Sequence, residues 1–212
     1  MSPESTGGDP APFTASDPPS IGQADRRRKV IALTQRVLFG LGCVALGAAG
    51  SLYLTTEIYQ VLESRGIDRA LGLPGAAPLA SVETGGVIGR IEVPRLGISA
   101  VIREGLDSGT LLLAVGHLPG SAQPGEEGNV VVGGHRDTFF RGLKGIRKND
   151  TVRIVTRGGS FLYLVDQTVI VTPDHTELLD RTDHPTLTLI TCYPFSFIGS
   201  APKRFIVRAR QS

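Results

Sequence analysis

Eighteen consecutive uncharged residues at positions 37–54 constrain this chain of 212 residues more than any other feature. As an α-helix rising about 1.5 Å per residue, such a run spans roughly 27 Å, which is close to the hydrocarbon thickness of a bilayer. The run is long for the core helix of a soluble domain, and its four glycines are tolerated better in membranes. We therefore predict one transmembrane segment at residues 30–54, with residues 37–54 as its core.

Basic residues flank this segment unevenly, and the imbalance predicts its orientation. Those before the uncharged run are Arg26, Arg27, Arg28, Lys29 and Arg36, whereas Arg65 and Arg69 follow shortly after it. The positive-inside rule then places the N-terminus in the cytoplasm and the rest of the chain outside the cell membrane. Small residues at 47–49 also fit the cleavage site of a signal peptide, but the run exceeds a usual h-region, which favours a retained single-pass anchor.

Residues 1–29 and 55–85 surround the membrane segment. The first 25 residues hold five prolines among glycine, serine, aspartate and alanine, which predicts a disordered cytoplasmic tail that ends in the basic cluster. After the span, Ile58, Val61 and Leu62 have helical spacing and predict a juxtamembrane helix. Proline and glycine then predict a linker up to residue 85.

Residues 86–212 have the pattern of a mainly β domain. Short runs rich in β-branched residues alternate with turn signals, at 87–93, 99–104, 129–134, 151–156, 161–171, 186–192 and 204–210. Short helical turns are expected at 108–113, 139–143 and 176–179. Seven or eight strands of this length predict a β-barrel. The net charge of +2, with scattered basic residues, gives no indication of nucleic-acid binding.

Cys192 is the candidate nucleophile. The only other cysteine, Cys43, lies inside the uncharged run, so we expect no intramolecular disulfide. A free thiol on an exported protein is exposed to oxidation, which favours a reactive role for Cys192. The alternative is that Cys192 packs as a small buried hydrophobe, which is the commoner role of a cysteine taken alone.

His135 and Arg204 complete a possible catalytic set, because each stands at the end of a predicted strand, as Cys192 does. Taken singly, a histidine at a sheet edge and a surface arginine are ordinary. A cysteine nucleophile, however, needs a nearby histidine or positive charge to supply reactive thiolate at neutral pH. A guanidinium keeps its charge, so it can bind substrate carbonyls and stabilise a developing oxyanion.

These residues stand in motifs that resemble those of sortases. Positions 188–192 read Thr-Leu-Ile-Thr-Cys and match the TLxTC signature of that family at every defined position. Gly134, His135 and Arg136 follow a valine-rich run, as the family's histidine segment does, and Arg204 falls where the family places its essential arginine. The likeness extends over nearly all of residues 86–212, including the runs 91–98 and 116–129. The Pro-Lys-Arg-Phe run at 202–205 resembles class D members.

The resemblance implies an eight-stranded sortase-type β-barrel with short helices. It implies cleavage of an LPxTG-like sorting signal after its threonine, through a thioester on Cys192, and transfer of the acyl group to an amine of peptidoglycan or of another protein. His135 would carry the protons, Arg204 would bind the peptide and the oxyanion, and Thr191 would help to shape the site beside the thiol. The implied partners are the sorting-signal protein, the amine acceptor and the membrane.

No cofactor or metal is predicted. Glu126 and Glu127 offer carboxylates of the kind that bind calcium in some sortases, but no ligand spacing supports such a site. His117 stands in a turn by composition and is expected to be structural. His175 and His184 lie in polar sequence and are expected to be solvated.

Two other functions compete with the transpeptidase hypothesis. One is a membrane-tethered β-barrel that binds envelope partners without chemistry. The other is a different exported cysteine acyl transferase, such as an L,D-transpeptidase. Those enzymes place His and Gly directly before the cysteine and an arginine two residues after it. Here Ile190 and Thr191 precede Cys192, and Pro194 stands two residues after it, which argues against that family.

Overall fold

The structure is a computed structural model that describes residues 21–71, 83–196 and 199–212. Contacts divide the chain into two units, Met1–Ser51 and Leu52–Ser212. The first 20 residues of the predicted disordered tail and most of the predicted linker, residues 72–82, lie outside the described residues.

Helix α1 covers Ile21–Leu71 and includes the predicted transmembrane segment. Its stretch Asp25–Arg69 is long and apolar enough to cross a membrane, with a window of mean hydropathy 1.9 that has no residue buried in the protein. The prediction of disorder up to residue 29 is wrong at its end, because α1 begins at Ile21 and the basic cluster is helical. The last proline of the tail is Pro19, and the arginines and lysine after it are good helix formers.

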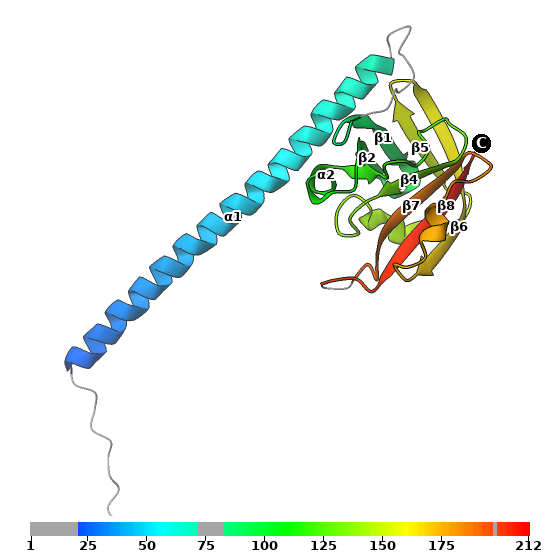
Figure 1. Ribbon diagram of the computed structural model, residues 1–212. Coiled ribbons are helices and arrows are strands. Elements are labelled where there is room, and N and C mark those ends of the chain that lie inside the picture. The colour runs from blue at the N-terminus through cyan, green and yellow to red at the C-terminus, as the bar shows by residue number, and fades with distance from the viewer. Residues whose placement is uncertain (1–20, 72–82, 197–198) are drawn as a thin grey trace, which may run out of the picture. The chain divides into compact units, whose positions relative to one another are not determined.

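Eight strands close into a barrel in the order β1-β2-β3-β4-β7-β8-β6-β5, which confirms the predicted architecture (Figure 1). The strands are β1 Val87–Val93, β2 Ile98–Glu104, β3 Val115–His117, β4 Asn129–Gly133, β5 Thr151–Thr156, β6 Gly159–Val171, β7 Thr186–Tyr193 and β8 Lys203–Gln211. Between them lie the short helices η1 Pro94–Leu96, α2 Ser108–Leu113, η2 Arg141–Gly145 and η3 Thr176–Leu179. Two neighbouring pairs, β2 with β3 and β4 with β7, are parallel.

Strand β3 is the element that the sequence analysis missed. It has only three residues, and Gly116 at its centre reads as part of a turn. Its residues nevertheless pair on both sides, with Ile102–Glu104 of β2 and with Val132 and Gly133 of β4. The helical turn expected at 139–143 begins two residues later, at Arg141, as η2. Both differences concern segments too short for periodicity to define.

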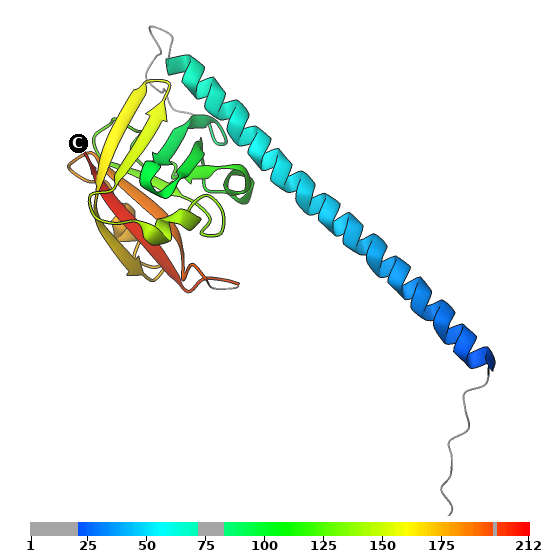
Figure 2. The ribbon, with the colours of Figure 1, turned by 180° about the vertical axis from the view of Figure 1, so that it is seen from behind.

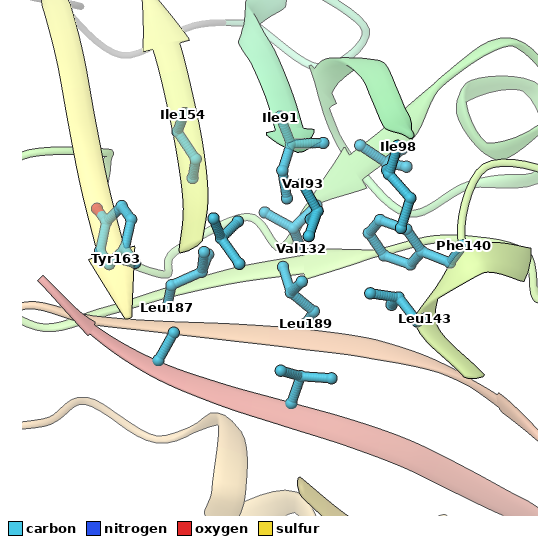
Figure 3. Packing of buried hydrophobic residues seen from close by; sticks show 14 of the residues in the cluster. Ile91, Val93, Ile98, Val132, Phe140, Leu143, Ile154, Tyr163, Leu187 and Leu189 are labelled. Atoms are coloured by element: carbon cyan, nitrogen blue, oxygen red, sulfur yellow. The ribbon is translucent and has the colours of Figure 1, made fainter. Parts of the chain in front are cut away.

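The barrel interior is filled by side chains that alternate along the strands (Figure 3). Leu187 and Leu189 of β7 point inward beside Val132 of β4, and Phe140 closes the same layer near Leu143. Each of these side chains is fully buried. Burial of a large apolar side chain contributes about 1.5–3 kcal/mol, so this layer fixes the strands whose ends carry the candidate site.

Strand alternation also determines what faces outward. With Leu187, Leu189 and Thr191 directed inward, Ile190 and Cys192 of β7 belong to the outer face of the barrel wall. Strands β7 and β8 run side by side along this wall, as the view from behind also shows (Figure 2).

Candidate active site

Cys192 and Arg204 are cross-strand partners. In the antiparallel pair of β7 and β8, Cys192 lies directly opposite Arg204. Directly opposed residues have Cβ atoms roughly 4.5–5.5 Å apart and project to the same face. The Cys192 side chain is half-buried, so its sulfur is neither sealed in the core nor fully solvated. A thiol and a guanidinium thus share one small region of the outer face.

His135 reaches the same region from the other side of β7. Strands β4 and β7 run parallel, with Gly133 opposite Ile190. The pairing continues beyond β4, because the amide of Gly134 donates to the carbonyl of Ile190 at 3.1 Å. His135 lies two residues beyond Gly133, and Cys192 lies two residues beyond Ile190, so both follow the last pair of these parallel strands. The His135 side chain is exposed.

Three neighbouring strand ends, those of β4, β7 and β8, therefore bring together the three residues proposed from sequence. All three belong to the outward-facing set of their strands, since Gly134, Thr191 and Phe205 next to them face the barrel interior. The position of Arg204 opposite Cys192 follows from strand register, whereas His135 lies two residues beyond the end of β4.

Thr191 supports the site from inside the barrel. Its side chain is buried, and its hydroxyl donates to the carbonyl of Gly134 at 2.7 Å. This bond ties the residue before Cys192 to the residue before His135. The position agrees with a shaping role for Thr191, whereas contact between Thr191 and a substrate stays a prediction.

Arg204 also holds the loop between β7 and β8. Its Nη1 donates to the carbonyls of Ala201 at 3.2 Å and of Lys203 at 3.0 Å. Within residues 83–196 and 199–212, no hydrogen bond involves its Nε or Nη2. Those two groups remain to donate to a ligand on the outer face, where Cys192 lies.

Arg136 is a residue of this region to which the sequence analysis gave no role. Its guanidinium is buried, donates from Nη2 to the carbonyl of Gly199 at 3.0 Å and pairs through Nε with Asp137 at 3.1 Å. The residue after His135 thereby binds the loop that follows Cys192. Its place in the Gly-His-Arg run was the only signal in the sequence.

Aromatic side chains cluster where β7 ends and β8 begins. Phe195 and Phe205 make an edge-to-face contact with centroids 5.3 Å apart, and Tyr193 lies 6.0 Å from Phe195 and 6.4 Å from Phe205. Phe195 and Phe205 also pack against the core. The cluster therefore connects the loop after Cys192 to the beginning of β8.

The remaining histidines lie apart from Cys192. His117 is fully buried, with Nδ1 2.8 Å from Glu104 Oε2 and Nε2 2.9 Å from the carbonyl of Ala122, as expected for a structural histidine. His184 and His175 are exposed. The hydrogen bond to Glu177, at 2.7 Å, raises the pKa of His175 above its ordinary value and lowers that of Glu177.

A cavity of about 580 Å³ lies at the opposite end of β4 from His135. Its lining includes Asn129, Leu179 and Arg181 together with Glu126 and Glu127, the two carboxylates considered for calcium. Glu126 accepts a hydrogen bond from the amide of Gln123 at 3.0 Å. In the described part of the chain, no three His, Cys, Asp or Glu side chains are grouped as metal ligands.

The family model described as the Sortase domain matches residues 91–212, which is more than half of the chain. The chain belongs to the sortase family. The match begins in β1 and includes the strand ends that carry His135, Cys192 and Arg204. The resemblance stated from the motifs is thus confirmed, and the sortase family is one of transpeptidases.

Relatives and solved structures agree with this assignment. Sortase D of Bacillus subtilis (strain 168) is 39% identical over 130 residues, which cover 61% of this chain and 66% of that protein. Sortase A of Bacillus anthracis is 25% identical over 132 residues, covering 60% and 61%. The chain therefore spans less than two thirds of either curated relative. A Clostridium perfringens sortase D5 transpeptidase structure has a TM-score of 0.57 and 28% identity, covering 62% of this chain and 82% of that one.

Proposed function

We propose that this sortase is a membrane-anchored cysteine transpeptidase that cleaves an LPxTG-like sorting signal and transfers the acyl group to an amine. The observation that supports the proposal is the strand register, in which Cys192 lies opposite Arg204 and the last pair of β4 and β7, Gly133 with Ile190, lies two residues before His135 and Cys192. A nucleophile, a proton carrier and a cation that does not titrate on one accessible surface are the groups that acyl transfer needs.

In the first half-reaction, the thiolate of Cys192 attacks the threonine carbonyl of the sorting signal. The carbonyl oxygen gains negative charge, and Arg204 donates to it from a guanidinium that keeps its own proton. The carbon–nitrogen bond then breaks as His135 gives its proton to the departing amine. The products are a thioester between Cys192 and the amino-terminal part of the substrate, and a released carboxy-terminal fragment that bears the new amino group.

In the second half-reaction, an amine replaces the sulfur. Neutral His135 takes a proton from the incoming amine as its nitrogen attacks the thioester carbonyl. Arg204 stabilises the second oxyanion, and the carbon–sulfur bond breaks to return the Cys192 thiolate and a protonated His135. The acceptor is an amine of peptidoglycan or of another protein subunit.

The proposed location follows from α1. Its apolar part has the length to cross a bilayer, and more basic residues precede that part than follow it. This arrangement supports a cytoplasmic N-terminus and an extracytoplasmic barrel.

A transfer assay tests the proposal. The full chain in detergent micelles is mixed with a library of LPxTG-like peptides and a small amine, and the products are identified by mass spectrometry. We expect cleavage after threonine and an amide-linked product, with both lost in Cys192→Ala and His135→Ala.

Cys43→Ser provides the matched control, since it removes the other thiol and should leave the reaction unchanged. Absence of cleavage for every peptide, together with a Cys192 unreactive toward thiol reagents at neutral pH, would instead favour a barrel that binds partners without chemistry.

A further inference from the structure

The last turns of α1 belong to the same contact unit as the barrel, Leu52–Ser212, and one face of these turns is covered by other residues of the unit. Most of the partly or fully buried residues of this stretch recur at intervals of three and four along the helix; they are Thr56, Tyr59, Gln60, Glu63, Ser64, Gly66 and Ile67. Such spacing defines a single helix face. Ile67 is only 3% exposed, so this face is packed against other parts of the unit.

Gln60 makes the central contact. Its Oε1 accepts the amide of Val101 in β2 at 2.8 Å, and its Nε2 donates to the carbonyl of Leu113 in α2 at 2.6 Å. Val101 is fully buried, and β3 begins to pair with β2 only at the next residue, Ile102. The side chain of Gln60 thus satisfies a buried backbone group that β3 leaves without a strand partner.

Charged groups hold the same face at two further points. Arg90 of β1 donates to both carboxylate oxygens of Asp68, at 2.8 and 3.2 Å, and to the carbonyl of Ser64 at 3.4 Å. The guanidinium of Arg103 in β2 lies over the ring of Tyr59, 5.5 Å from its centroid. These directional contacts fix which residues of the helix lie against which residues of β1, β2 and α2.

The contacts lead toward His135 in a short chain. Leu113 ends α2, and two residues later Val115 of β3 packs so closely on Gly134 that a Cβ there would lie 3.0 Å from its Cγ1. Gly134 directly precedes His135 and is bonded to β7 through Ile190. Gln60 is therefore connected, through Leu113 of α2 and Val115 of β3, to the backbone at the end of β4.

We propose that residues 56–67 form a helical strut whose docking, centred on the positioning residue Gln60, holds β2, α2 and β3 in place behind His135. The inference rests on the proposed function only for its effect on catalysis. Apolar spacing did not reveal the strut, because Ile58, Val61 and Leu62 lie on the exposed face. The predicted boundary at residue 86 stays a prediction, and the strut adds an earlier segment that works with the barrel.

Hydrogen exchange in the full chain in detergent micelles tests the strut. In Gln60→Ala we expect the amide of Val101 to exchange at least tenfold faster and those of Gly134 and His135 to exchange faster as well. Asp68→Ala, which removes the ion pair between Arg90 and the residue just after the strut, should have the same effect in weaker form. Glu57→Ala, on an exposed position of the helix, is the matched control and should change nothing.

Peptide cleavage provides the separate readout. We expect kcat/KM to fall several-fold in Gln60→Ala through kcat, with KM unchanged. Unaltered exchange at Val101 in Gln60→Ala would overturn the docking, and unaltered exchange at Gly134 and His135 would overturn the support of the active site. A wild-type chain that cleaves no peptide would refute the proposed function, while the exchange rates would still decide whether the strut exists.

Discussion

Arg204 and Arg208 occupy outward-facing positions of β8, but only Arg204 lies opposite Cys192; Arg208 pairs with Thr188. Arg204→Lys keeps the positive charge and loses the planar fork of donors. Because loss of one oxyanion donor commonly costs a factor of about 10²–10³, we expect kcat/KM to fall about a hundredfold in the peptide cleavage assay. Arg208→Lys should retain nearly full activity, and equal losses in the two variants would contradict a specific role for Arg204.

His175 and Glu177 give a pH-dependent signal outside the proposed site. Since the hydrogen bond to Glu177 raises the pKa of His175, the pair stabilises the folded state below the ordinary histidine pKa, and this contribution disappears as the pH rises through the raised value. Both groups are exposed, so the effect on stability is small. In an NMR titration, Glu177→Gln should lower the pKa of His175; an unchanged pKa would show that the pair does not form.

Residue roles were predictable where a side chain has few chemical uses. The free thiol of Cys192, next to a threonine-rich strand, and the histidine and arginine at other strand ends were visible in the sequence. Arg136 was not recognised, because its importance comes from burial and from a bond to Gly199, 63 positions away. Thr191 likewise required the structure to reveal its partner, Gly134.

The short strand β3 depends on a side-chain pair as well as on its backbone bonds. His117 at its end is held by Glu104 at the end of β2, and both side chains are buried. Glu104→Ala leaves the buried His117 ring without this hydrogen-bond partner, and an unsatisfied buried polar group costs about 1–3 kcal/mol. Urea unfolding of the variant should show a loss of that order, whereas Glu127→Ala, at an exposed position, should show almost none.

Elements with strong alternation were predictable, and elements defined by distant partners were not. Strands β1 and β7 follow the predicted ranges within one residue because their β-branched runs are bounded by turn signals. Strand β3 has no such pattern, because it is a strand only through its pairing with β2 and β4. The helical face at residues 56–67 is polar, so the hydrophobic pattern pointed to its opposite side.

For the whole molecule, the two cysteines offer a test of topology. Cys43 lies in the apolar part of α1, and Cys192 lies in the barrel. If the barrel is extracytoplasmic, a membrane-impermeant maleimide added to intact cells should label the wild-type chain and Cys43→Ser, and should not label Cys192→Ala. Labelling of Cys192 only after cell lysis would contradict the proposed orientation.

The barrel was predictable as a class because the number and spacing of β-branched runs allow few alternatives. The family resemblance added the number of eight strands, but the strand order was not predicted, because periodicity carries no information on which strands are neighbours. The convergence of Cys192, His135 and Arg204 depends on that order, with β7 between β4 and β8.

The most direct test of this account is the covalent intermediate on the full chain. The chain is mixed briefly with a sorting-signal peptide, and the reaction is quenched at low pH. Intact-mass measurement and peptide mapping should then find the acyl group on Cys192. The adduct should persist in Cys43→Ser and be absent from Cys192→Ala. An adduct on Cys43, or peptide cleavage by Cys192→Ala at the wild-type rate, would contradict the account.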